Sequence, residues 1–185
     1  MEPTVGTPSE PTTWGRRPFD VWLFRRMGAG HGARAGWLPV ACAVAQHSWI
    51  VLLPTLMLMT LGLQGGGWTA LQCLGVATLA QVLSKQCAAR WAAPRPFALG
   101  LSQNHLGHGP RAGLPSTHAA VMGAVVGFMA VAAPTHPLLA LLGATALATA
   151  WARVYAGAHF PGDVLLGLSM GGSLGWAGAM LFGPA

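Results

Sequence analysis

A cation, an imidazole and a carboxylate stand close together near the end of the sequence. They are Arg153, His159 and Asp163, and they lie between two apolar stretches. Ionisable residues at the edge of a membrane are costly and usually serve a function. His159 and Asp163 are four residues apart, so at the start of a helix they share a face and the carboxylate can accept a proton from one imidazole nitrogen. The other nitrogen is then a nucleophile that can attack phosphorus and form a phosphohistidine.

A second cluster, Pro115-Ser116-Thr117-His118, precedes another apolar stretch. Its histidine, His118, is the natural general acid for the departing alcohol. Ser116 stands where an N-cap would begin one helix, and Pro161 suits the first turn of another. Both helices would direct their N-terminal amides and positive dipole ends at one spot, which favours a bound anion.

A phosphate monoester is nearly dianionic at neutral pH, because its second pKa is ≈ 6. A site for it therefore needs several fixed cations and donors. Lys85, Arg95 and Arg153 are the candidates in this sequence. Guanidinium groups offer planar, bidentate donors that suit phosphate oxygens. These motifs together predict a phosphate-binding pocket.

The composition indicates a membrane protein of one domain. The chain has 185 residues, of which 53% are hydrophobic and only 8% charged, whereas roughly a quarter of residues are charged in ordinary soluble domains. Its 26 Gly favour close helix packing in lipid. The expected fold class is all-α, a polytopic membrane helix bundle of about five transmembrane helices.

Five apolar stretches are near the length needed to cross ~30 Å of hydrocarbon. They are Trp37 to Leu63, Trp68 to about Arg90, His118 to Ala133, Leu138 to Tyr155 and Val164 to Phe182. Gln46, His47, Ser48 and Pro54 interrupt the first stretch, and a long polar loop, about 92–115, follows the second. In the last stretch Gly167, Gly171 and Gly175 form a ladder that lets a neighbouring backbone approach closely.

The first 36 residues form a separate segment, and residues 37–185 form the membrane domain. Residues 1–13 are rich in Pro, Thr and Glu and are expected to be disordered. Trp14 to Arg34 mixes apolar and basic residues, which fits either an amphipathic helix on anionic lipid or a basic juxtamembrane tail. With five spans, all ten Lys and Arg residues fall on the membrane face that holds the motifs.

The three motifs resemble the signature of the type 2 phosphatidic acid phosphatase superfamily, which shares its fold with vanadium haloperoxidases. They are Lys85 with Arg95-Pro96, then Pro115-Ser116-Thr117-His118, then Arg153-x5-His159-x3-Asp163. The resemblance covers residues from about 68 to 182. It implies an integral membrane lipid phosphatase that uses no metal or other cofactor, with His159 as nucleophile, Asp163 orienting it and His118 as acid.

The resemblance also implies a set of phosphate ligands. They are Lys85, Arg95, Arg153, Ser116 and the amide of Thr117. The first motif departs from the usual spacing, since Lys85 stands ten residues before Arg95 instead of seven, and Arg90 is an alternative. Thr117 stands where the family usually has Gly, so the loop must adopt an ordinary conformation there.

Two other functions are open at this stage. One is a non-catalytic membrane lipid-binding or transport protein that retains the fold, and the other is vanadate-dependent halogenation. His105 and His108 suggest either a metal site or, more simply, head-group recognition. His31, His47 and His136 are expected to be structural, and Cys42, Cys73 and Cys87 to be packing residues.

The expected substrate is a lipid phosphate monoester or pyrophosphate, and no nucleic-acid partner is expected. No sequence feature separates phosphatidate, phosphatidylglycerol phosphate, polyprenyl pyrophosphate and lipid A phosphates. The expected location is the bacterial inner membrane. The excess of basic residues places the site on the cytoplasmic face, whereas the resemblance implies the periplasmic face.

Overall fold

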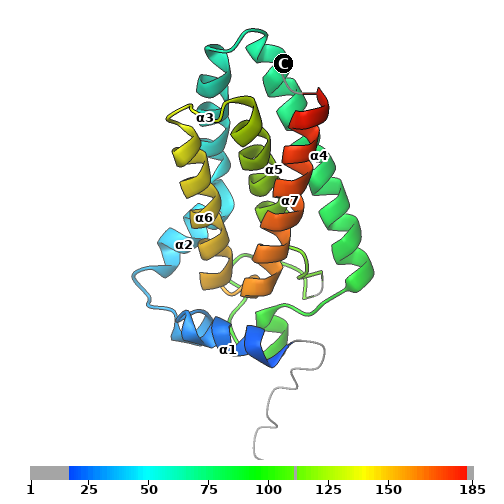
Figure 1. The fold of residues 1–185 in the computed structure, drawn as a ribbon. Helices are drawn as coiled ribbons and strands as arrows, with labels where there is room; N and C mark the ends of the chain where they lie inside the picture. Colours follow the sequence, from blue (N-terminus) through cyan, green and yellow to red (C-terminus); the bar gives the residue numbers. More distant parts are fainter. Residues whose placement is uncertain (1–16, 111, 183–185) are drawn as a thin grey trace, which may run out of the picture.

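The computed structural model describes residues 17–110 and 112–182. Within these ranges the chain is helical and has no strand, which confirms the all-α class (Figure 1). The helices are α1 (Pro18–Arg26), α2 (Leu38–His47), α3 (Trp49–Leu61), α4 (Gly66–Trp91), α5 (Thr117–Ala132), α6 (Leu139–Tyr155) and α7 (Pro161–Phe182), with the short 3-10 helices η1 (Gly30–Gly32) and η2 (Pro96–Leu99). The predicted disorder of residues 1–13 lies outside the described residues, as do Arg16 and Arg111.

Helix α5 lies at the centre of the bundle and packs most closely against α7, with α4 and α6 on its other sides (Figure 1). The glycine ladder permits this approach. A Cβ atom at Gly167, Gly171 or Gly175 would collide with the backbone carbonyls of α5 at Ser116, Ala120 and Ala124. The predicted ladder is therefore confirmed, and it fixes the start of α7 against the start of α5.

Replacing Gly171 with Val is expected to destabilise the protein by about 3 kcal/mol or more, because the new side chain must push two packed helices apart. Thermal unfolding in detergent measures the loss. Gly75→Val on α4 is the control, since nothing lies within 4 Å of a Cβ placed at Gly75. Equal stability of Gly171→Val and Gly75→Val would contradict the proposed packing.

The first predicted span is not one straight helix. It breaks at Ser48 into α2 and α3, which are bent by 46° relative to one another. The His47 imidazole lies 3.2 Å from the Ala43 carbonyl and competes there with the helical hydrogen bond. In the described chain no backbone hydrogen bond crosses the break to the amides of Trp49 and Ile50. Pro54, the other expected interruption, lies inside α3.

The count of five transmembrane helices is not confirmed. Among the described residues α7 alone is long and apolar enough by itself, and the bent α2–α3 pair qualifies if it forms one span. The apolar helices α5 and α6 have 16 and 17 residues, and 16 residues extend only ~24 Å at 1.5 Å per residue. Five spans therefore stay a prediction.

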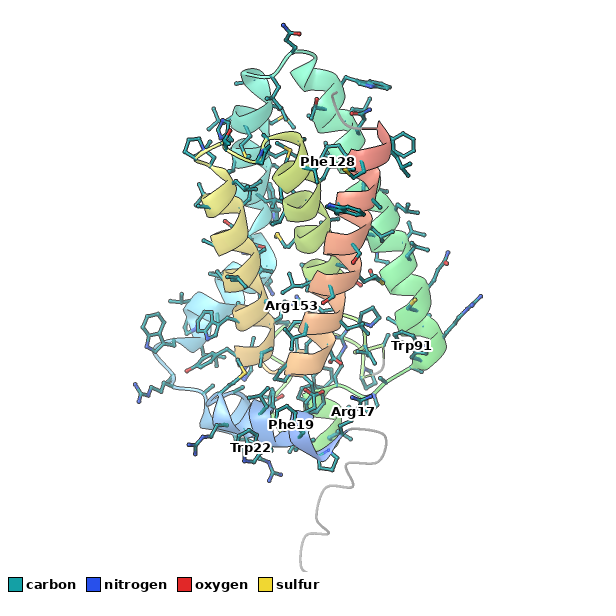
Figure 2. The ribbon with its side chains drawn as sticks, viewed as in Figure 1. Arg17, Phe19, Trp22, Trp91, Phe128 and Arg153 are labelled. Carbon is teal, nitrogen blue, oxygen red and sulfur yellow. The ribbon has the colours of Figure 1, made fainter. Side chains whose placement is uncertain are left out.

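Helix α1 lies across the end of the bundle where α6 ends and α7 begins (Figure 1). Its inner face packs on the turn between these helices, with the Phe24 ring 5.4 Å from the Phe160 ring. Asp20 accepts a hydrogen bond from the Gly162 amide at 2.8 Å. On the outer face Phe19 and Trp22 are exposed and stacked (Figure 2). The predicted N-terminal helix thus exists, and it is attached to the segment that carries His159.

Candidate active site

The turn after α6 places His159 beside Arg153. Gly157 adopts a φ of 73°, which glycine tolerates best, and the turn reverses the chain there. A Cβ at Gly157 would also collide with the Ser102 side chain, whose hydroxyl donates to the Gly157 carbonyl at 3.2 Å. The Arg153 carbonyl then accepts the amides of Ala158 and His159 at 3.1 and 3.2 Å. Arg153 and His159 are therefore held together by backbone bonds as well as by their side chains.

Asp163 builds the first turn of α7. Its Oδ2 accepts the Phe160 amide at 2.9 Å, while the Phe160 carbonyl accepts the Asp163 amide at 3.0 Å. The bond from the Phe160 amide to the Asp163 carboxylate is one half of a capping box, and α7 begins at Pro161 as expected. The Asp163 carbonyl also accepts the Ser116 amide at 2.9 Å. The beginnings of α5 and α7 are thus joined directly, and both N-termini face the same space.

Asp163 lies beside His159, as the sequence predicts, but the shortest contact of His159 Nδ1 is with a backbone carbonyl. His159 Nδ1 lies 2.8 Å from the Gly113 carbonyl and 3.6 Å from Asp163 Oδ2, and 3.6 Å is too long for a hydrogen bond. Nδ1 therefore carries the proton and donates it to Gly113. Asp163 remains near as a negative charge, because Oδ2 is taken by the Phe160 amide. The predicted consequence still follows: the lone pair is on Nε2.

Two guanidinium groups converge on His159 Nε2. Arg95 Nη1 lies 3.0 Å from it and Arg153 Nη2 lies 3.2 Å from it. Arg95 also donates to the carbonyls of Ala158 and Ala112, at 2.9 and 3.1 Å. Burial and the two arginines lower the pKa of His159 to about 4, and Asp163 offsets only part of this effect. The imidazole is therefore neutral at pH 7, as a nucleophile must be.

The lowered pKa of His159 predicts that the folded protein is less stable in acid. The pKa of His159 is about 4 in the folded protein and ≈ 6.5 in an unfolded chain. Between these values the unfolded chain binds the extra proton, so stability falls as the pH drops from about 6.5 to about 4. Thermal midpoints at pH 7 and pH 4.5 test this. Wild type should lose more stability than His159→Asn over this interval, and equal losses would contradict the neutral, buried imidazole.

Two buried polar atoms beside this cluster have no hydrogen-bond partner in the described chain. They are Ser116 Oγ and Arg153 Nε. Arg153 is only 2% exposed, and no carboxylate of the described residues forms a salt bridge with it. Buried polar groups are normally paired, and a buried charge without a counterion is expensive. A dianion bound between Arg153 and Ser116 would satisfy both atoms. Ser116 is the N-cap residue of α5, as predicted, although its side chain makes no capping hydrogen bond.

His108 is a third histidine at the site. Its Nε2 lies 2.8 Å from Arg153 Nη2, and its Nδ1 lies 2.9 Å from the Leu106 carbonyl. Nδ1 therefore donates, and Nε2 accepts from Arg153. Asn104 fixes the loop by pairing its side chain with the amide and carbonyl of His108 at 3.0 and 2.8 Å. Burial, Arg153 and Arg95 lower the pKa of His108, against a weaker effect of Leu106. His108 therefore supports Arg153, and its expected head-group role stays a prediction.

The other predicted site residues divide into two groups. His118 is exposed on the first turn of α5, whose start is joined to α7 by the bond from the Ser116 amide to the Asp163 carbonyl. Thr117 is helical and its φ is not positive, as expected. Lys85, by contrast, is exposed on α4 and makes no hydrogen bond or ion pair in the described residues. Its alternative, Arg90, is exposed as well, so neither is brought into the cluster.

The remaining histidines and cysteines have local roles. His31 bonds the Gly100 carbonyl, His47 the Ala43 carbonyl, and His136 the Leu138 amide. The three cysteines are unpaired, and Cys73 is buried. In the described part of the chain no three His, Cys, Asp or Glu residues are grouped so as to hold a metal ion.

The pattern of the PAP2 superfamily matches residues 66–183, which is more than half of the chain. The protein therefore belongs to the PAP2 superfamily, and the predicted resemblance is confirmed. No curated protein sequence matches the chain.

Two solved structures are similar to this chain. LpxE from Aquifex aeolicus is 21% identical, with a TM-score of 0.68 over 89% of this chain and 96% of that protein. A transmembrane PAP2-type phosphatidylglycerolphosphate phosphatase from Bacillus subtilis is 20% identical, with a TM-score of 0.49 over 91% of this chain and 79% of that protein. The match to LpxE shows that the two proteins share a fold.

Proposed function

We propose that the protein is a membrane lipid phosphate phosphatase that works without a metal ion, through a phosphohistidine at His159. The main support is the pair of unsatisfied buried groups, Arg153 Nε and Ser116 Oγ, beside a neutral imidazole. A phosphoryl group is the ligand whose charge and acceptor oxygens suit them. Membership of the PAP2 superfamily supports the same activity.

In the first step, Nε2 of His159 attacks phosphorus and the bond from phosphorus to the leaving oxygen breaks. In the structure Nε2 accepts hydrogen bonds from Arg95 and Arg153. Both guanidinium groups must therefore turn toward the phosphoryl oxygens, which frees the lone pair of Nε2. The electron pair of the broken bond goes to the leaving oxygen, which takes a proton from His118. The bound dianion favours the protonated form of His118 against the nearby arginines.

In the second step, water attacks phosphorus and the bond to Nε2 breaks. The neutral His118 accepts the proton of this water, which restores its acid form. The proton stays on Nδ1, hydrogen-bonded to the Gly113 carbonyl, throughout, and Asp163 stabilises the positive charge that the imidazole acquires in the intermediate. The amides at the beginning of α5 and the two arginines meet the charge on the equatorial oxygens.

A lipid substrate is supported by the surface of the molecule. Large apolar side chains are exposed along the helices, including Leu58, Leu71, Leu147 and Leu165. Such a surface suits a bilayer and is unusual for a soluble enzyme. Helix α1 brings the exposed Phe19 and Trp22 and the basic Arg25 and Arg26 to the end that holds the site. This combination fits attachment to an anionic lipid surface.

Purified protein in mixed detergent and lipid micelles tests the activity. It should release inorganic phosphate from a lipid phosphate, and a chelator of divalent metals should leave the rate unchanged. Loss of release on chelation would contradict a metal-independent reaction. Lipid phosphate binding without any release would favour the non-catalytic alternative.

A further inference from the structure

A cavity of about 200 Å³ lies beside His118, at the break between α2 and α3. Its polar lining comes from α2, α3, α4, α5 and the break itself, and consists of Gln46, Ser48, Trp49, Gln81, Thr117 and His118. Apolar side chains, among them Leu52 and Met122, complete the wall. None of the residues that line it is a carboxylate, a lysine or an arginine.

The cavity contains hydrogen-bonding groups that the fold itself does not use. In the described chain the side chains of Gln46, Ser48 and Gln81 make no hydrogen bond to another residue. The break adds the amide of Trp49, which has no backbone partner across it in the described residues. Gln46 and Gln81 are exposed, so a group bound in the cavity can reach their carboxamides. The α2–α3 break and α4, which are distant in sequence, bring these groups to one place.

The cavity lies on the side where the proposed reaction would place the leaving group. Phosphoryl transfer places the attacking and leaving atoms on opposite sides of phosphorus. His159 supplies the attacking nitrogen and His118 protonates the leaving oxygen. The leaving group therefore lies on the His118 side, and His118 lines the cavity.

The size and chemistry of the cavity limit what it can hold. A volume of about 200 Å³ is below the ≈ 300–1,000 Å³ of pockets that enclose a whole drug-sized ligand. It accepts only the part of a lipid next to the phosphate, while the hydrocarbon chains lie outside against apolar surface. Carboxamides both donate and accept, so they suit uncharged ester, amide or hydroxyl groups.

We infer that this cavity binds the uncharged, hydrogen-bonding part of the lipid leaving group, through Gln46 and Gln81. The inference rests on the proposed phosphatase function and narrows its substrate class. An acylated glycerol or acylated sugar carries ester, amide or hydroxyl groups next to its phosphate. A polyprenyl phosphate has only hydrocarbon there and leaves both carboxamides unpaired, which costs affinity.

Steady-state kinetics of wild type and of Gln46→Leu/Gln81→Leu test this assignment. The substrates are a diacylglycerol phosphate, an acylated glucosamine phosphate, a polyprenyl phosphate and the water-soluble p-nitrophenyl phosphate. Wild type should prefer one or both of the first two to polyprenyl phosphate. In the double variant KM for the preferred lipid should rise about ten-fold or more, while the constants for the last two substrates stay unchanged. The acylated substrate with the higher kcat/KM shows whether the polar group belongs to a glycerol or to a sugar.

Gln86→Leu is the matched control, because Gln86 is exposed on α4 and does not line the cavity. It should behave as wild type on all four substrates. An equal loss on every substrate in the double variant would assign the glutamines a structural role and overturn the inference. Equal use of polyprenyl phosphate by wild type would overturn it as well. Failure of wild type on all four substrates would instead contradict the proposed function.

Discussion

His159→Asn is expected to abolish phosphate release, with a loss of at least about 10⁴-fold in kcat, the scale seen when an enzyme loses its nucleophile. Asparagine is a fair probe because its side chain can still donate to the Gly113 carbonyl that holds Nδ1. It cannot supply the lone pair of Nε2, which faces Arg95 and Arg153. The measurement is inorganic phosphate released from a lipid phosphate in micelles.

The control for this variant is His136→Asn, a histidine at the opposite end of the bundle that bonds its own loop. It should keep wild-type activity. The His159→Asn protein should still bind the phosphate analogue vanadate, because Arg153 and Ser116 are intact. Retention of more than a few per cent of the wild-type rate in His159→Asn would remove His159 from the reaction.

His118→Asn is expected to separate substrates by their leaving groups. A general acid contributes typically 10²–10⁴-fold, and this contribution is needed only where the leaving oxygen is strongly basic. Release from a lipid phosphate, whose leaving group is an alkoxide, should fall by about 10²-fold or more. The nitrophenolate burst from p-nitrophenyl phosphate, which reports the first step alone, should slow less than about five-fold, because nitrophenolate departs without a proton. The first-step rates of the two substrates are the quantities to compare.

A matched variant of a second histidine shows whether the difference between the two substrates is specific to His118. His108→Asn removes the imidazole that contacts Arg153, so it should affect both substrates alike. If His118→Asn also slowed both substrates equally, His118 would be a binding or structural residue. The acid would then have to be sought elsewhere in the cluster.

The sequence was sufficient to predict the fold class and most of the site. The periodic apolar stretches located α4 to α7 within three residues, and the glycine ladder indicated the tight α5–α7 contact. The residues of the motif around His159 are close together in sequence, so one turn fixes their relative positions. His118 and Arg95 were predicted from motifs as well; the fold brings Arg95 into contact with His159 and places His118 on the first turn of α5.

What the sequence did not predict depends on contacts between distant segments. The Gly113 carbonyl is the partner of Nδ1 because the polar loop folds back over the site, and a backbone carbonyl has no signature in a sequence. The His108–Arg153 contact has the same cause. Gln46 was expected only as an interruption of the first apolar stretch, Gln81 was not singled out, and the two line one cavity only in the fold. Lys85 was chosen by motif order, yet its side of α4 is exposed.

The covalent role of His159 is the central claim, and trapping the intermediate tests it most directly. Protein turning over p-nitrophenyl phosphate should be quenched in strong alkali within the first turnover, digested, and analysed by mass spectrometry. We predict a phosphoryl group on Nε2 of His159, absent from His159→Asn. A phosphoryl group on any other residue, or a nitrophenolate burst with no phosphorylated protein, would contradict the account.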